Sequence, residues 1–189
     1  QPKDALVLVD DAAVLAPGDF DVLILSIQVF IRLQQLDLAA RLLEELPEPI
    51  DQEQRAATYL THALWHEAQQ EFERMYYFLR AALEACPEHP EVLDKIASAV
   101  ELTRRYDDSI RLHREIIDRF PYNYQAWYNL GLALVFTNKY REALDAFEYA
   151  FIIDPHFELA FKEYIELAFS LRQYKNVLRC YEDVGQNFL

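Results

Sequence analysis

The sequence predicts an all-α protein built from helix pairs that repeat along the chain. Of its 189 residues, 52% are hydrophobic, 26% are charged and only 3 are glycine, which is typical of a folded, helix-rich chain. Pro87, Pro121 and Pro155 stand 34 residues apart, and each follows an apolar stretch at a point where a helix should end. A period of this length indicates stacked units rather than a single globular core.

The aromatic and small residues keep the same period. Tyr140 aligns with Tyr106 one period earlier and with Tyr174 one period later. Within one unit, Tyr140, Ala143 and Phe147 follow the i, i+3, i+7 spacing of a helix with one buried face. One unit alone cannot cover that face, so neighbouring units are expected to stack on each other.

The best-formed unit runs from Tyr124 to Phe157. Its characteristic residues are Trp127, Leu130, Gly131, Leu134, Tyr140, Ala143, Phe147, Ala150 and Pro155. This set resembles the tetratricopeptide repeat (TPR), with its pattern W-x2-L-G-x2-Y, then A-x3-F, then P, except that Leu134 replaces the usual aromatic residue. The resemblance implies a right-handed α-solenoid of antiparallel helix pairs, the TPR superhelix, in which the first helix of each pair lines a concave groove.

We expect a single solenoid over residues 1–189, with repeats at about 20–55, 56–89, 90–123, 124–157 and 158–189. The repeat at about 20–55 needs two extra residues around Pro47-Glu48-Pro49. Residues 1–18 are expected to form the second helix of a truncated repeat, because Lys3-Asp4-Ala5-Leu6 aligns with Arg141-Glu142-Ala143-Leu144. This alignment predicts that the sequence is a fragment of a longer repeat array.

The charge restricts the classes of partner. A net charge of −14 disfavours nucleic acids and anionic membrane surfaces, which bind through clustered Lys and Arg. The longest apolar run, residues 22–31, is far shorter than the ~20 residues that span a bilayer. Cys86 and Cys180 form neither a paired motif nor a disulfide framework, so a reducing, cytoplasmic location is expected.

The resemblance places the partner-binding groove on the first helices. The residues expected to line it are Glu91, Asp94, Lys95, Ser98, Glu101, Gln125, Tyr128, Asn129, Leu132, Phe136, Lys162 and Glu166. This set is acidic with apolar and aromatic patches, so it fits a peptide or helical segment that carries basic and apolar side chains. Tyr128 and Phe136 could together present an aromatic platform. The alternative is that the acidic residues are merely solvated.

Some tetratricopeptide domains hold the C-terminal carboxylate of a peptide with a clamp of Lys, Asn and Arg. Asn129 matches the central Asn of this clamp. Asp94 and Ser98 stand where the preceding Lys and Asn should be, and Leu159 and Glu163 replace the following basic pair. Peptides that end in a free carboxylate are therefore expected to be poor ligands.

No residue pattern indicates catalysis or a cofactor. His62 and His66 have the i, i+4 spacing of a zinc pair, but no third ligand occurs at a supporting spacing, and both fall on the packing stripe of their helix. The sequence has no Gly-rich phosphate loop and no nucleophile elbow. We therefore expect a protein-interaction scaffold that is not an enzyme and binds no cofactor or metal.

Two other functions remain open at this stage. Exposed terminal helices such as residues 174–188 could pair with a second copy of the chain, which would make the protein a self-association module. The chain could also be a regulatory or substrate-recruiting arm of an enzyme whose catalytic domain lies outside this fragment.

Overall fold

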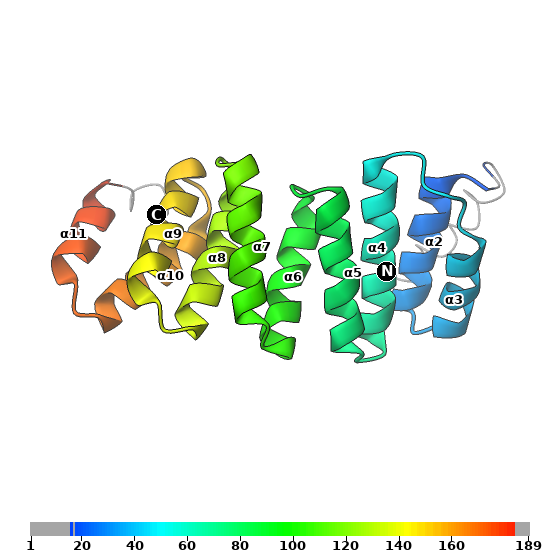
Figure 1. Cartoon of the computed structure of the whole chain (residues 1–189), viewed down its shortest axis with the longest axis horizontal. Helices are drawn as coiled ribbons and strands as arrows, with labels where there is room; N and C mark the ends of the chain where they lie inside the picture. Colours follow the sequence, from blue (N-terminus) through cyan, green and yellow to red (C-terminus); the bar gives the residue numbers. More distant parts are fainter. Residues whose placement is uncertain (1–15, 17, 184–189) are drawn as a thin grey trace. The chain divides into compact units, whose positions relative to one another are not determined.

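A computed structural model describes residue 16 and residues 18–183 of the chain. Every regular element in this part is an α-helix, which confirms the predicted all-α class (Figure 1). The chain divides into two compact units, Gln1–Thr103 and Arg104–Leu189. The helix expected over residues 1–18 lies outside the described residues, apart from Ala16 and Gly18.

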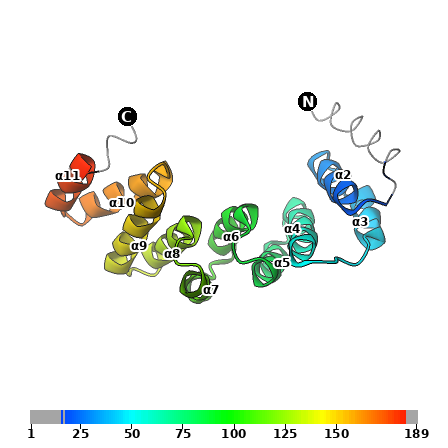
Figure 2. The same ribbon diagram turned by 90° about the horizontal axis from the view of Figure 1, so that it is seen from above.

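The first unit contains α2 (Phe20–Arg32), α3 (Leu36–Glu45), α4 (Gln52–Ala68), α5 (Phe72–Ala85) and α6 (Pro90–Thr103). Consecutive helices pack against each other, and α2 also packs against α4. Seen from above, α2, α4 and α6 form one layer of this unit, and α3 and α5 form the other (Figure 2). The helices of the first layer therefore share a face that their second-layer partners do not cover.

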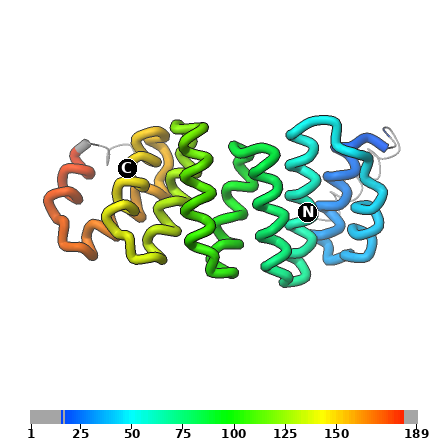
Figure 3. Tube along the Cα trace, in the orientation of Figure 1, coloured from blue at the N-terminus to red at the C-terminus, as the bar shows by residue number. Residues whose placement is uncertain are grey.

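The second unit contains α7 (Tyr106–Arg119), α8 (Tyr124–Phe136), α9 (Tyr140–Ile153), α10 (Glu158–Ser170) and α11 (Tyr174–Asp183). Each helix packs on the next one along the chain, and short turns reverse the direction between them (Figure 3). In the residues that the structure describes, no helix has the combination of length and apolarity needed to cross a membrane.

Polar caps and prolines fix where many of these helices begin and end. Side-chain oxygens of Asp19, Asp51 and Asn123 accept backbone N–H groups in the first turns of α2, α4 and α8. These bonds satisfy donors that have no partner within the helix. Helices α5, α7 and α9 each end two residues before one of the prolines that mark the 34-residue period. Proline therefore follows these helix ends, as the sequence predicts.

The turns between first and second helices share one backbone conformation. Gln34, Gln70, Arg104, Asn138 and Arg172 all have positive φ, between 56° and 61°. From Gln70 onward these residues recur every 34 positions, whereas the step from Gln34 to Gln70 is 36. The first step is thus two residues longer than the others. The left-handed residue reverses the chain within a few residues, and within each unit the two helices that such a turn joins pack against each other.

Small residues let the helices of the second unit approach closely. A Cβ atom added at Gly131 would lie 2.5 Å from the ring of Phe147, so the α9 ring occupies the space that a side chain on α8 would need. Phe147 itself is completely buried. The core of the first unit is also well buried, since Leu60, Met75 and Leu79 are exposed by 2% or less.

Candidate functional site

The predicted groove residues fall into two sets, one in each unit. In the first unit, α6 carries Glu91, Asp94, Lys95, Ser98 and Glu101. All are exposed except Lys95, which is half-buried, while the opposite face of the helix buries only apolar residues. Helix α6 thus presents a polar, mainly acidic surface.

The charge of Lys95 is neutralised within the first unit. Its Nζ atom donates to both carboxylate oxygens of Glu67 on α4, at 3.0 and 2.8 Å. About one third of each side chain is exposed, so this ion pair is partly shielded from water. Lys95 is the only basic residue of α6. Since α6 also carries Glu91, Asp94 and Glu101, the formal net charge of the helix is negative.

In the second unit, α8 carries Gln125, Tyr128, Asn129, Leu132 and Phe136. Phe136 is 49% exposed, and Gln125, Tyr128 and Leu132 are half-buried. Asn129 is only 4% exposed, so it belongs to the packed side of the helix. Helix α8 contains no charged residue, so its accessible face is neutral and largely apolar.

The two aromatic residues predicted to form a platform are each fixed by other rings. Tyr128 meets Phe157 edge-on, with ring centroids 5.1 Å apart. Phe136 stacks on Tyr106 of α7 at 4.6 Å and an interplanar angle of 10°. These contacts fix both rings before a partner binds, which reduces the side-chain conformational entropy that is lost on binding. Their joint use as a platform stays a prediction.

Helix α10 combines apolar ends with a charged middle. Leu159 and Phe169 are 54% and 61% exposed. Lys162 and Glu166 are also exposed, and Lys162 Nζ lies 4.0 Å from Glu166 Oε1. Burial, with a smaller effect of Glu166, raises the pKa of the Glu163 carboxyl, against the opposing effect of Lys162. With three glutamates and one lysine, α10 has the same formal net charge as α6.

The paired histidines serve helix packing in the first unit. The rings of His62 and His66 both stack on Phe78, with centroids 4.9 and 5.2 Å away. His66 Nδ1 lies 2.7 Å from Glu71 Oε2, and this hydrogen bond is the main cause that lowers the pKa of Glu71. Burial, followed by the neighbouring His66, lowers the pKa of His62. The described part of the chain contains no group of three His, Cys, Asp or Glu side chains suited to a metal ion.

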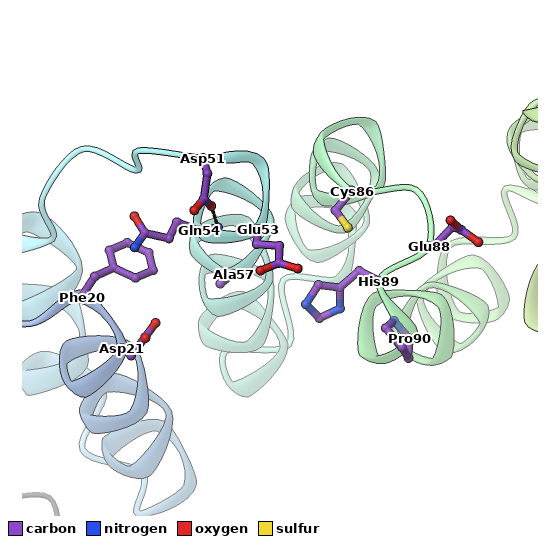
Figure 4. Close-up of a pocket in the computed structure, with 10 residues that line it drawn as sticks. All are labelled: Phe20, Asp21, Asp51, Glu53, Gln54, Ala57, Cys86, Glu88, His89 and Pro90. Atoms are coloured by element: carbon purple, nitrogen blue, oxygen red, sulfur yellow. Dashed lines mark hydrogen bonds between the residues drawn. The ribbon is translucent and has the colours of Figure 1, made fainter. Parts of the chain in front are cut away.

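A cavity of about 580 Å³ opens in the first unit at the N-terminal ends of α2, α4 and α6 (Figure 4). Its lining residues are Phe20, Asp21, Asp51, Glu53, Gln54, Ala57, Cys86, Glu88, His89 and Pro90. Four of them are acidic, and none is Lys or Arg. Sequence analysis missed this cavity because its walls come from three segments far apart in the chain. The sequence signal, acidic residues at successive helix starts, is equally typical of helix capping.

A second cavity, of about 480 Å³, lies among α9, α10 and α11. It is lined by Arg141, Leu144, Asp145, Glu148, Tyr164, Gln173, Asn176 and Arg179. Arg179 approaches Glu148 to 3.9 Å, and burial raises the pKa of the Tyr164 hydroxyl. With two basic and two acidic residues in its walls, this cavity has no net preference for either sign of charge.

Comparison with known proteins identifies the fold but not a close relative. No family profile matches the sequence, and no curated protein matches it. Two solved structures illustrate the similarity. MamA from Desulfovibrio magneticus RS-1 has a TM-score of 0.62 at 15% identity, covering 85% of this chain and 90% of its own. PilF from Pseudomonas aeruginosa has a TM-score of 0.65 at 20% identity, covering 88% of this chain and 75% of its own.

MamA and PilF are both tetratricopeptide repeat proteins. At such low identity the similarity concerns the fold, and it agrees with the repeat pattern read from residues 124–157. The chain is therefore an α-solenoid of helix pairs with the fold of the tetratricopeptide repeat proteins.

Proposed function

We propose that this protein is a scaffold that binds a segment of another protein on the exposed faces of its first-layer helices, which are α2, α4 and α6 in the first unit and α8 and α10 in the second. The observation that carries this proposal is the exposure of large apolar side chains on successive first helices of the second unit. Phe136 on α8 and Leu159 and Phe169 on α10 are each about half exposed or more. Apolar side chains gathered on one surface are typical of sites where another protein binds. The tetratricopeptide fold supports the same function, because stacked helix pairs leave one layer free for recognition.

The surfaces of the two units differ in their chemistry. The α6 face of the first unit is mainly acidic, whereas the α8 face of the second unit is neutral and largely apolar. Buried apolar anchors supply most of the binding energy in protein interfaces, and charges mainly accelerate association and select partners. We therefore expect a partner segment that carries both apolar and basic side chains.

Affinity capture from a lysate of the source organism tests this function. One variant, Phe136→Ala/Phe169→Ala, removes apolar anchors, and another, Glu91→Lys/Asp94→Lys, reverses charge on α6. Two controls change exposed residues on second-layer helices: Tyr77→Ala on α5, whose ring is 68% exposed, and Glu44→Lys/Glu45→Lys on α3. We expect the first-layer variants to lose proteins that the wild type and both controls retain. Identical captured sets in all variants would show that the first-layer faces are not the binding surface.

Self-association is a second candidate, favoured by α11. Tyr174, Leu178 and Tyr181 on this helix are 50%, 64% and 50% exposed and share one side at i, i+4, i+7 spacing. A second copy of the chain could cover this stripe. Light scattering over a range of concentrations separates the candidates, because a constant monomer mass would eliminate self-association.

A further inference from the structure

We propose that α11 pairs with α11 of a second copy of the chain in antiparallel orientation, about a two-fold axis at Leu178. This inference rests on self-association, the second candidate function above, and adds the orientation of the two copies and the residues that set it. The apolar part of the surface is the α11 stripe, formed by Tyr174, Leu178 and Tyr181. At least half of each of these side chains is exposed.

The α11 stripe lies beside the face that holds the helix on its own unit. Helix α11 packs on α10, and Cys180, at 6% exposed, lies on the packed side. The two tyrosines at the ends of the stripe meet α10 rings edge-on: Tyr174 contacts Phe169 at 5.3 Å between centroids, and Tyr181 contacts Phe161 at 5.4 Å. The stripe is therefore fixed before a second copy binds, which lowers the entropy cost of association.

Two opposite charges line one edge of the stripe. Lys175 and Glu182 each follow a tyrosine of the stripe by one position, so both lie on the same side of it. They are two helical turns apart, about 10 Å along the axis. Both side chains are exposed, and in the described part of the chain neither takes part in an ion pair. Both charges are therefore available to a second copy.

These two charges oppose the dipole of their own helix. Carboxylates stabilise the N-terminus of a helix and cations stabilise its C-terminus. Helices α2 and α7 follow this rule, with acidic residues in the first turn and an arginine in the last. Helix α11 has Lys175 in its first turn and Glu182 in its last. A neighbouring helix that runs in the opposite direction removes the conflict, because it brings a glutamate to the N-terminus and a lysine to the C-terminus.

An antiparallel two-fold axis brings the same edge of both helices together. The midpoint between Lys175 and Glu182 lies at Leu178, so with the axis there Lys175 of each copy faces Glu182 of the other. In a parallel pair this edge would meet the opposite edge of the second helix, where Val177 lies, and neither charge would find a counterpart. A two-fold interface must be complementary to itself, and the charged edge of α11 meets this condition only in the antiparallel pair.

The charge of the chain also favours this helix for contact between copies. Two chains of net charge −14 repel each other over most of their surface. Helix α11 contains two basic and two acidic residues, so its formal charge is zero. Two copies can therefore approach through α11 without bringing an excess of like charge together.

Sedimentation equilibrium of the full chain between about 10 µM and about 1 mM tests the pairing. We expect a dimer that dissociates on dilution, because an interface made by one short helix from each copy is small. Leu178→Ala removes an exposed side chain at the axis from both copies and should weaken the dimer by about 10-fold or more. A monomer at every concentration would overturn this inference together with self-association, whereas the scaffold function would still be decided by affinity capture.

Exchange of the two charges tests the orientation. Lys175→Glu and Glu182→Lys should each weaken the dimer by about 10-fold, since each places like charges opposite each other twice. The double variant Lys175→Glu/Glu182→Lys should regain the wild-type affinity, and an equimolar mixture of the two single variants should form a mixed dimer. General repulsion predicts a different result, because Glu182→Lys lowers the net negative charge and would then strengthen the dimer.

Lys139→Glu is the matched control for Lys175→Glu. It makes the same change of charge at an exposed position before α9, outside the stripe, and should leave the dimer unchanged. If Lys139→Glu weakens the dimer as much as Lys175→Glu does, or if the double variant is no better than the single ones, the antiparallel assignment is refuted. A dimer that persists in that case would retain self-association in another geometry.

Discussion

Gly131 shows at the scale of one residue why the repeat needs a small side chain on its first helix. The sequence indicates the requirement because Ala97 and Ala63 stand one and two periods before Gly131, and the structure gives the physical reason. The α9 ring of Phe147 fills the space that a Cβ atom of residue 131 would occupy. Since Phe147 is fully buried, the ring cannot move aside into solvent.

Gly131→Ala should therefore destabilise the protein. Alanine is a better helix former than glycine by ~1 kcal/mol, so helix propensity alone predicts a gain. The 2.5 Å approach to Phe147 forces the helices apart, and overpacking of this kind costs about 1–3 kcal/mol. Urea denaturation measures the net effect, which we expect to be a loss.

Repacking provides the control for this substitution. In a Phe147→Leu background the smaller side chain leaves room for the added methyl group, so Gly131→Ala should cost less there than in the wild type. An equal cost in both backgrounds would mean that the close contact with Phe147 is not the cause.

His113 is a second residue whose environment has a measurable consequence. It is completely buried on α7, with Nδ1 2.9 Å from the carbonyl oxygen of Ser109 and Nε2 buried without a partner. Burial lowers its pKa from 6.5 to about 4, against the opposing effect of the Ser109 hydrogen bond. The unfolded chain therefore binds a proton at a higher pH than the folded chain does.

Acid should destabilise the protein between pH 6.5 and about 4 through His113. Above this window the residue is neutral in both states and its contribution is complete; below it both states are protonated and the loss levels off. The difference between the pKa of His113 in the unfolded chain and in the folded chain corresponds to roughly 3 kcal/mol of unfolding free energy. Urea denaturation across this range should show a steeper loss for the wild type than for His113→Leu. Parallel curves would contradict the assigned cause, because carboxylates such as Glu71 and Asp108 titrate in both proteins.

At the scale of helices, the 34-residue period predicted the fold because it is the number of residues in one helix pair with its turns. Prolines and left-handed turn residues recur at this step since each pair must stop and reverse at the same places. Side-chain partners between helices could not be predicted in the same way. Lys95 pairs with Glu67 on another helix, and Asn129 turns into the packed side of α8. The acidic cavity depends on three segments that only packing brings together.

The repeated turn conformation leads to a prediction for stability. Gln70 has φ of 61°, a left-handed conformation that is strained for a residue with a Cβ atom. Gln70→Gly should raise the unfolding free energy by about 0.5–1 kcal/mol, the strain relieved minus the greater freedom of glycine in the unfolded chain.

Asn138→Gly is the matched control for the turn. Asn138 has φ of 60° in the corresponding turn, but asparagine tolerates this conformation, and its side chain accepts a hydrogen bond from the Tyr140 hydroxyl. The substitution should therefore gain little or lose stability. Urea midpoints that rise equally for both variants would show that strain at Gln70 is not the reason.

For the whole molecule, charge imbalance is the dominant property. The chain has 32 acidic and 18 basic residues, and 19 of the acidic but only 7 of the basic residues belong to the first unit, so repulsion among carboxylates opposes folding mainly there. Several described ion pairs, such as Arg114 with Glu142, are about half exposed and contribute little to stability. Screening by salt should therefore remove more repulsion than attraction.

The same salt should have opposite effects on folding and on binding. Raising NaCl from about 10 to about 150 mM shortens the screening length from ~30 to ~8 Å, which weakens repulsion between carboxylates spread over a surface. We expect the midpoint of thermal unfolding to rise over this range. Affinity for a basic partner segment should fall, because salt also screens the attraction between the carboxylates and the basic side chains of the partner. Differential scanning calorimetry and titration calorimetry measure the two effects, with sucrose of equal osmolarity as the uncharged control. A midpoint that falls with NaCl would mean that local ion pairs outweigh the net charge of −14.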